Sequence, residues 1–439
     1  MSSPAPHLAC AEARLSRLSL RLSPAEELLL LCAQAEVDAT QLAHMRQLVG
    51  GVGLDWQRFV ELAVEHEGLP LVARRLSAPP LAELVPPFML AQARRARLQT
   101  LARNLSLHAE LERIADTLHA SGVPAVPLKG TSLAQRLFGS LDARRVGDID
   151  VLVPEARLLQ ARAALRDLGY TAMIGGEAHT FHGAPFVRET ASLAVVVELH
   201  WGLNDPGFVS VDYPRLWERV LAYTPENVPL RTLPDEETLL YLALHLPKHQ
   251  HGVLRLLADV DRLVRRAGPG LDWAYALQLA ERWQVGVLLY FALDRSKLLF
   301  GTPLPESALA ELRPAAWRRL LVAQLAGPRA VLRPPSKSHM RYSRLQLAYC
   351  AMLTPLGRAF AAYRHYLCLR PEHARPGVLG RLLSPLERPA GGIGRTALAF
   401  GSVVADRLGP GPKTSLASFG DAGSLPGAAV PRAGTRASL

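Results

Sequence analysis

Cysteine is scarce in this chain of 439 residues, and its four copies, Cys10, Cys32, Cys350 and Cys368, stand far apart. None of them forms the Cys-x-x-Cys pair of zinc sites, and the spacing indicates no disulfide framework. Residues 1–10 lack the continuous apolar region of a signal peptide. No stretch approaches the run of about 20 apolar residues that crosses a bilayer. We therefore expect a cytoplasmic enzyme with no membrane partner.

Acidic residues are outnumbered, since 39 Asp and Glu face 50 Lys and Arg, which gives a net charge of +11. Lysine is rare, so the positive charge is nearly all arginine, a side chain that suits bidentate contacts with phosphate and carboxylate. High arginine use is also typical of a GC-rich genome. The charge therefore raises only modestly the expectation of a nucleotide, nucleic-acid or acidic-peptide partner.

Residues 123–153 predict a strand, a tight turn, a helix and a second strand. The turn is Lys129-Gly130-Thr131-Ser132, and the residues after it show the apolar spacing of a helix. Backbone N–H groups at a helix N-terminus bind phosphate, so the turn is a candidate phosphate site. Lys129 either contacts a triphosphate or is solvated at the end of the strand.

The second strand of this stretch, residues 148–153, carries two carboxylates. Side chains alternate along a strand, so Asp148 and Asp150 project from one face, about 7 Å apart. Ionised carboxylates this close raise each other's pKa unless a cation lies between them. A divalent metal ion is the simplest such cation.

A third strand at residues 193–201 is apolar until Glu198. If it lies beside residues 148–153, Glu198 becomes the third carboxylate of one cluster, whereas a slip of one residue turns it to the opposite face. His200 shares the parity of Glu198. The favoured interpretation of His200 is a structural histidine bonded to a backbone carbonyl, and the alternative is a cleft residue.

The order LKG, then R-x-x-D-I-D-V-L-V, then E-L-H-W resembles the uncharacterised bacterial nucleotidyltransferase family of the polymerase-beta superfamily, over about residues 55–264. The resemblance implies that Gly130 and Thr131 seat a nucleotide triphosphate. It also implies that Asp148, Asp150 and Glu198 are the catalytic acids and hold two Mg²⁺ ions. The superfamily turn is usually Gly-Ser, whereas here it is Gly-Thr followed by serine.

Further polar residues are candidates for the same site. Arg144 and Arg145 precede the acids and either contact substrate phosphate or pair with Asp142, Asp148 or Asp150. His245 lies near His249 and His251, but Pro247 between them and the absence of an H-E-x-x-H pattern argue against zinc. We expect His245, Arg255 and Asp259 either to line the cleft or to form a buried structural network.

The pattern predicts an α+β fold, in which a small mixed β-sheet of the nucleotidyltransferase type is flanked by N- and C-terminal helical units. Among the expected elements are a long helix at 88–119, a hairpin of 186–190 and 193–199 about a turn at 191–192, and helices at 272–300, 305–325 and 343–368. The expected divisions are a flexible N-terminus (1–21), a helical N-terminal unit (22–120), the nucleotidyltransferase core (121–205), a helical C-terminal domain (206–370), a Pro/Gly-rich segment with short helices (371–408) and a disordered tail (409–439).

The phosphate turn and the three acids indicate a metal-dependent phosphoryl-transfer site. The resemblance implies the particular reaction, which is transfer of a nucleoside monophosphate from an NTP to an acceptor with release of pyrophosphate. A small molecule, peptide or protein acceptor is favoured over RNA, because few aromatic residues accompany the basic region at 313–344. Two alternatives stay open. One is an inactive scaffold of this fold in a biosynthetic or toxin–antitoxin assembly, and the other is an RNA-modifying nucleotidyltransferase.

Overall fold

The structure is a computed structural model, and it describes residues 22–173, 182–190, 193–204, 209–223, 231–248 and 253–326, with Leu332, Met352 and Leu353. Residues 1–21, the turn at 191–192, the segment 371–408 and the tail 409–439 lie outside these residues, and so does nearly all of the helix expected at 343–368.

Five strands form one mixed sheet, as expected. They are β1 (Val126–Pro127), β2 (Ile149–Leu152), β3 (Thr171–Ala172), β4 (Gly183–Glu189) and β5 (Ala194–His200). Their order in the sheet is β1-β2-β5-β4-β3. Strands β2 and β5 are parallel, and every other neighbouring pair is antiparallel. The expected hairpin is the antiparallel pair β4–β5, although β4 begins at Gly183, before the expected residue 186.

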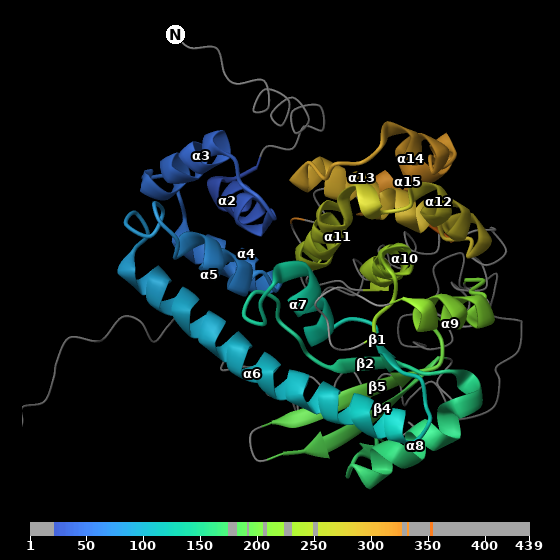
Figure 1. Cartoon of the computed structure of the whole chain (residues 1–439). Coiled ribbons are helices and arrows are strands. Elements are labelled where there is room, and N and C mark those ends of the chain that lie inside the picture. Colours follow the sequence, from blue (N-terminus) through green and yellow to red (C-terminus); the bar gives the residue numbers. More distant parts are fainter. Residues whose placement is uncertain are drawn as a thin grey trace, which may run out of the picture.

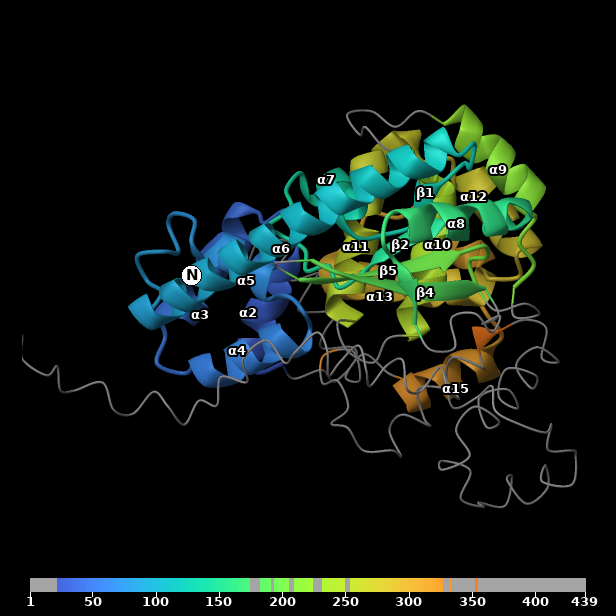
Figure 2. The ribbon, with the colours of Figure 1, turned by 90° about the horizontal axis from the view of Figure 1, so that it is seen from below.

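The helices before the sheet pack against one another through apolar side chains. They are α2 (Pro24–Ala33), α3 (Ala39–Gly50), α4 (Trp56–Glu65), α5 (Leu69–Leu76) and α6 (Pro87–Ala120). A capping box opens α2, where the Ser23 and Glu26 side chains satisfy each other's backbone N–H groups. The expected long helix is confirmed as α6, which runs from the N-terminal helices to the sheet (Figures 1 and 2).

The other helices are α7 (Thr131–Phe138) and α8 (Leu158–Asp167) within the sheet region, and α9 (Tyr213–Ala222), α10 (Asp235–His245), α11 (Val253–Ala267), α12 (Trp273–Arg282), α13 (Gly286–Phe300), α14 (Glu306–Glu311) and α15 (Ala316–Ala326) after it. The continuous helices expected at 272–300 and 305–325 are wrong. Gln284 adopts a left-handed conformation with φ of 60° between α12 and α13. Pro314 lies between α14 and α15, where it cannot donate a helical hydrogen bond.

The two faces of the sheet contact different apolar cores. Ile149 and Val151 point to the face that packs on α6 and α8. Leu152 points to the opposite face and joins the larger core of the N-terminal and C-terminal helices. The expected alternation of this strand is therefore confirmed, and Asp150 projects on the side of Leu152.

A buried carboxylate fixes α6 to the outer strands. Glu110 of α6 accepts hydrogen bonds from Arg113 (2.6 Å), from the Tyr170 hydroxyl (2.6 Å) and from Arg188 of β4 (2.5 Å). Burial disfavours the charged carboxylate, but these donors outweigh it and lower the pKa of Glu110.

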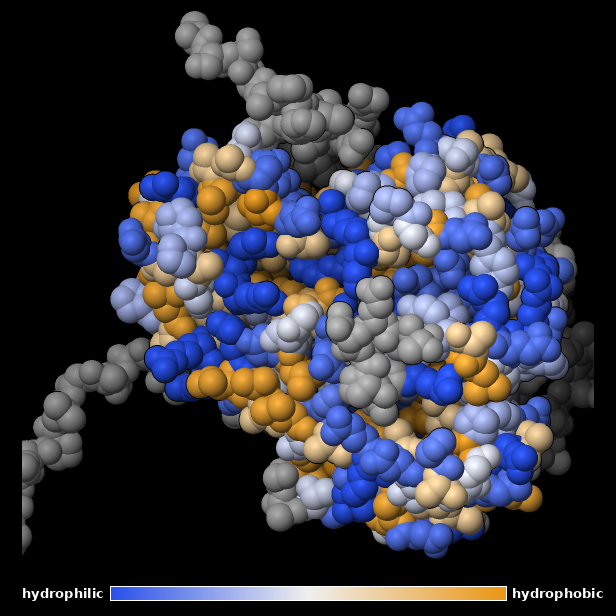
Figure 3. Space-filling model, viewed as in Figure 1, coloured by the Kyte–Doolittle hydropathy of each residue, from blue (hydrophilic) through white to orange (hydrophobic). Residues whose placement is uncertain are grey.

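The N-terminal helices also meet α11 through polar groups. Glu67, which follows α4, accepts a hydrogen bond of 2.8 Å from Arg255 of α11. Hydrophilic residues gather on the side of the molecule shown in Figure 3, over the region between α5 and α11. Among the described residues, no helix combines the length and the apolar character needed to cross a membrane.

Candidate active site

The expected phosphate turn lies between β1 and α7. Gly130 is the N-cap of α7, with φ of 80° and ψ of −138°. A Cβ atom there would meet ordinary contacts, at 3.5 Å from the Asp148 carbonyl oxygen, so the backbone angle rather than space requires glycine. Thr131 and Ser132 are buried in the first turn of α7. The first N–H groups of α7 have no partner within the helix, as at any helix N-terminus.

Lys129 points back at the acids. Its Nζ lies 3.2 Å from Asp150 Oδ2 and 3.7 Å from Asp148 Oδ1. Burial opposes the charged amine, but the attraction of Asp148 and Asp150 outweighs it and raises the pKa of Lys129. The interpretation of Lys129 as a solvated side chain is wrong, because only 13% of that side chain is exposed. Lys129 is an internal cation between the two aspartates.

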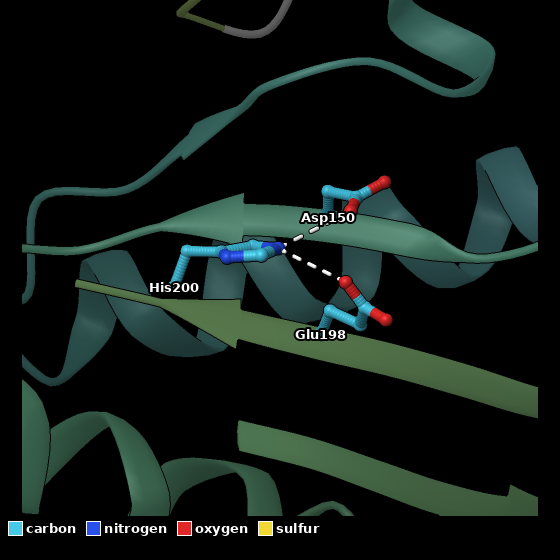
Figure 4. A group of neighbouring side chains, drawn as sticks. All are labelled: Asp150, Glu198 and His200. Atoms are coloured by element: carbon cyan, nitrogen blue, oxygen red, sulfur yellow. Dashed lines mark hydrogen bonds and ion pairs between the residues drawn. The ribbon is translucent and has the colours of Figure 1, made fainter. Parts of the chain in front are cut away.

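The third acid stands directly opposite the second. Parallel pairing of β2 and β5 places Asp150 opposite Glu198, so the register that the sequence required is present. His200, two residues further along β5, points its ring between them (Figure 4). Its Nε2 lies 3.2 Å from Asp150 Oδ1 and 3.3 Å from Glu198 Oε2. The favoured interpretation of His200, a bond to a backbone carbonyl, is therefore wrong.

These contacts change the ionisation of the cluster. Burial disfavours the imidazolium, but Asp150 and Glu198 outweigh this and raise the pKa of His200 to about 9. The hydrogen bond from His200 in turn outweighs burial and lowers the pKa of Glu198. Burial and the nearby Asp150 raise the pKa of Asp148. At neutral pH, Lys129 and His200 are thus the cationic neighbours of the acids.

Helix α6 holds the loop that precedes the acids. Asn104, which is fully buried, donates through Nδ2 to the carbonyl oxygens of Leu141 (2.6 Å) and Arg144 (2.7 Å). Arg103 donates to the carbonyl oxygens of Val146 (3.0 Å) and Gly147 (2.8 Å). These bonds fix the backbone just before Asp148, so a long-range contact positions the first acid.

The two arginines before the acids lie in different environments. Arg144 is buried and donates to both carboxylate oxygens of Asp259 on α11, at 2.9 to 3.1 Å. Its partner is therefore Asp259 rather than Asp142, Asp148 or Asp150. Arg145 is exposed. Arg255 Nη1 lies 3.8 Å from Asp259, so the buried network expected for Arg255 and Asp259 is present, and it extends to Glu67.

His245 lies at the end of α10, where its ring stacks on that of Tyr241 at 5.7 Å between centroids. Tyr241 is buried, and burial with the nearby charge of Asp150 raises the pKa of its hydroxyl. His249 and His251 lie outside the described residues.

Several residues of this region carry no sequence pattern that predicts their place. Tyr241 lies in an apolar run of α10, and His108 of α6 lies 3.2 Å from the Thr131 hydroxyl. Asn104 and Glu67 carry no local pattern either. A buried Asn in the middle of a helix was the one available signal, since asparagine is an unfavourable helix residue without a tertiary partner.

The donor atoms fit a divalent cation. One oxygen each from Asp150 and Glu198 and one nitrogen from His200 lie within 4.8 Å of one another. Asp150 Oδ2 is buried and accepts no hydrogen bond in the described part of the chain, so it retains a free lone pair beside the Lys129 ion pair. Carboxylate oxygens are the ligands that Mg²⁺ prefers in proteins.

Acids that converge from two parallel strands beside a glycine turn at a helix N-terminus define a class of site suited to phosphate chemistry. The model of the uncharacterised nucleotidyltransferase family matches residues 53–301. Since this match covers more than half of the chain, the protein belongs to that family and is a nucleotidyltransferase. No curated protein and no solved structure matches the chain.

Proposed function

We propose that this nucleotidyltransferase moves a nucleoside monophosphate from an NTP to an acceptor hydroxyl, amine or phosphate, and releases pyrophosphate. The observation that carries the proposal is the pairing of Asp150 with Glu198 on parallel strands. With Asp148 on the same side, it gathers three acids beside the Gly130 turn. Bound Mg²⁺ would neutralise the charge that develops on the phosphates.

Each acid has a defined part in this proposal. Asp148 and Asp150 would hold the cation that accompanies the triphosphate. Asp150 and Glu198 would hold a second cation beside the acceptor, because the two oxygens of Asp150 face opposite partners. Glu198 would also accept the proton of the acceptor, as its depressed pKa keeps it ionised and 29% of its side chain is exposed.

Basic and polar groups would position the nucleotide. The N–H groups of Thr131 and Ser132 begin α7, so they would bind phosphate oxygens. Lys129, the residue before Gly130, would add a positive charge beside these phosphates. Arg145 is exposed and would meet the nucleotide, whereas Arg144 is committed to Asp259 and would act by fixing the loop.

We propose a small molecule, peptide or protein as the acceptor, and the cytoplasm as the compartment. The RNA alternative is supported by the basic charge of the chain. In the basic region at 313–344, Arg318 is only 7% exposed and lies over the Trp317 ring at 5.1 Å. Most of the other basic residues of that region lie outside the described residues. A steep fall of RNA binding with rising salt would revive this alternative.

A second candidate function has an observation of its own. Lys129 and His200 lie at ion-pair distance from the acids, since Lys129 Nζ is 3.2 Å from Asp150 Oδ2 and His200 Nε2 is 3.2 Å from Asp150 Oδ1. Acids that already have basic partners within the protein also suit a non-catalytic binding protein that retains the fold.

The position of a label separates these functions. The protein is incubated with Mg²⁺, a fractionated cell extract and each NTP, labelled either at the α- or at the γ-phosphorus. Nucleotidyl transfer moves the α label to the acceptor and leaves the γ label in pyrophosphate. A γ label on the acceptor would indicate phosphoryl transfer instead. NTP binding without transfer of either label would favour the non-catalytic function.

A further inference from the structure

Asp150, Glu198 and His200 each offer one ligand atom at the proposed second cation position, and the atom of His200 is a nitrogen. We propose that His200 joins Asp150 and Glu198 as a metal ligand, and that this position takes Mn²⁺ or Co²⁺ in preference to Mg²⁺. The inference rests on the proposed function and identifies the kind of ion that its second cation position selects.

The spacing of the donors agrees with a shared ligand position. Nε2 of His200 is separated from Asp150 Oδ1 by 3.2 Å and from Glu198 Oε2 by 3.3 Å. Two ligands that stand about 2.1 Å from one cation at right angles are about 3.0 Å apart. The three atoms therefore need to move only slightly to share an ion. All three point toward one another in Figure 4.

Asp150 divides the site into two positions of different chemistry. Its Oδ2 faces Lys129, whose ammonium group also contacts a carboxylate oxygen of Asp148, so the two acids on this side offer oxygen atoms. Its Oδ1 faces His200, where an imidazole nitrogen is added. Oxygen ligands suit Mg²⁺, whereas an imidazole nitrogen favours first-row transition metals.

Packing adds to the hydrogen bond of Nε2 with Asp150 in holding the imidazole in place. His200 pairs with Gly183 across β4 and β5, and a Cβ atom at Gly183 would stand only 2.9 Å from His200 Nδ1. The His182 ring stacks on the His200 ring, with 5.6 Å between centroids. Nδ1 forms no hydrogen bond with the described residues. Nε2 therefore keeps its direction toward the acids because the ring is enclosed.

The opposing explanation treats His200 as a counter-ion of the acids and not as a ligand, and the two explanations predict changes of opposite sign. Mg²⁺, Mn²⁺ and Co²⁺ are titrated calorimetrically into the full chain without nucleotide. A ligand role predicts that His200→Gln weakens Mn²⁺ and Co²⁺ binding about tenfold or more, with a smaller change for Mg²⁺. A counter-ion role predicts tighter binding of all three ions, since a positive charge is removed.

His44 provides the matched control. It also pairs with a carboxylate, at 2.9 Å from Glu27, but it lies on α3 away from the acids. His44→Gln should leave the affinity for each ion unchanged.

The unsubstituted protein offers a second test, which does not depend on the folding of a variant. Pulsed electron paramagnetic resonance of the Mn²⁺-loaded chain should show coupling to a nitrogen nucleus, and the coupling should change when histidine alone is labelled with nitrogen-15. The inference would be overturned if the unsubstituted chain bound Mn²⁺ no more tightly than Mg²⁺, or if no coupling to histidine nitrogen were observed. In either case the proposed function would stand if the α label is still transferred with Mg²⁺. Failure of the chain to bind any of the three ions would overturn both.

Discussion

The buried pair of Arg144 and Asp259 allows a prediction of stability that can be worked from the structure. The exposed fraction is 2% for Arg144 and 0% for Asp259, and the guanidinium donates to both oxygens of the carboxylate. Loss of one partner leaves an uncompensated buried charge, which costs about 3–5 kcal/mol. Asp259→Asn retains one acceptor oxygen, so we expect a loss of about 3 kcal/mol.

Urea denaturation of the full chain measures this loss. With a slope of about 3 kcal/mol/M, typical of the upper range for small proteins, the midpoint should fall by about 1 M. The exposed ion pair of Arg58 and Glu61 supplies the control, because Glu61→Gln should cost less than about 1 kcal/mol. An equally small loss in Asp259→Asn would refute the burial of this pair and its part in fixing the loop before Asp148.

Three further predictions address the acids, a pH dependence and the tail. Asp150→Asn should abolish label transfer in a folded protein, whereas Asp167→Asn, an exposed aspartate at the end of α8, should not; near-wild-type transfer in the first variant would remove it from the site. The pKa of Glu110 is lowered from its usual 4.5 by its donors although burial opposes them, so its contribution to stability is present above about pH 4.5 and is lost as pH falls through the lowered pKa. The excess urea stability of the wild type over Glu110→Gln should therefore shrink below about pH 4.5, and a pH-independent difference would contradict this. Deletion of residues 409–439 should shift the melting temperature by less than about 2 °C, because their composition offers little apolar surface to bury; a drop of several degrees would show that they pack on the body.

Local periodicity was sufficient to predict the two acid-bearing strands and the residues that share a face on each of them. The alternation of residues 148–153 predicted the side to which Asp150 points, and the apolar run before Glu198 predicted its strand. The sequence showed that the site requires a particular register between β2 and β5, but it did not predict that this register occurs. Nothing local to either strand determines which residue of one lies opposite which residue of the other.

Long-range partners were not predictable in the same way. Arg144 and Asp259 are 115 positions apart, and their pairing depends on how α11 packs near the loop. The contact of His200 was unpredictable for the same reason. Its place on the same face of the strand as Glu198 was evident, but its contact with Asp150, 50 positions away, was not. The break at Gln284 was also unpredictable, because a left-handed glutamine has no sequence signature, whereas Pro314 was a visible signal for the other break.

Glu198→Gln provides the most direct test of the central claim that three acids form one nucleotidyl-transfer site. The substitution keeps the size and hydrogen-bonding capacity of the side chain and removes its charge. Turnover should fall at least about 100-fold, or about 2.7 kcal/mol, while NTP affinity through the Gly130 turn changes less than about threefold. Glu189→Gln, at an exposed position of neighbouring β4, should leave both quantities unchanged. Unchanged turnover in Glu198→Gln would contradict the claim and favour the non-catalytic function.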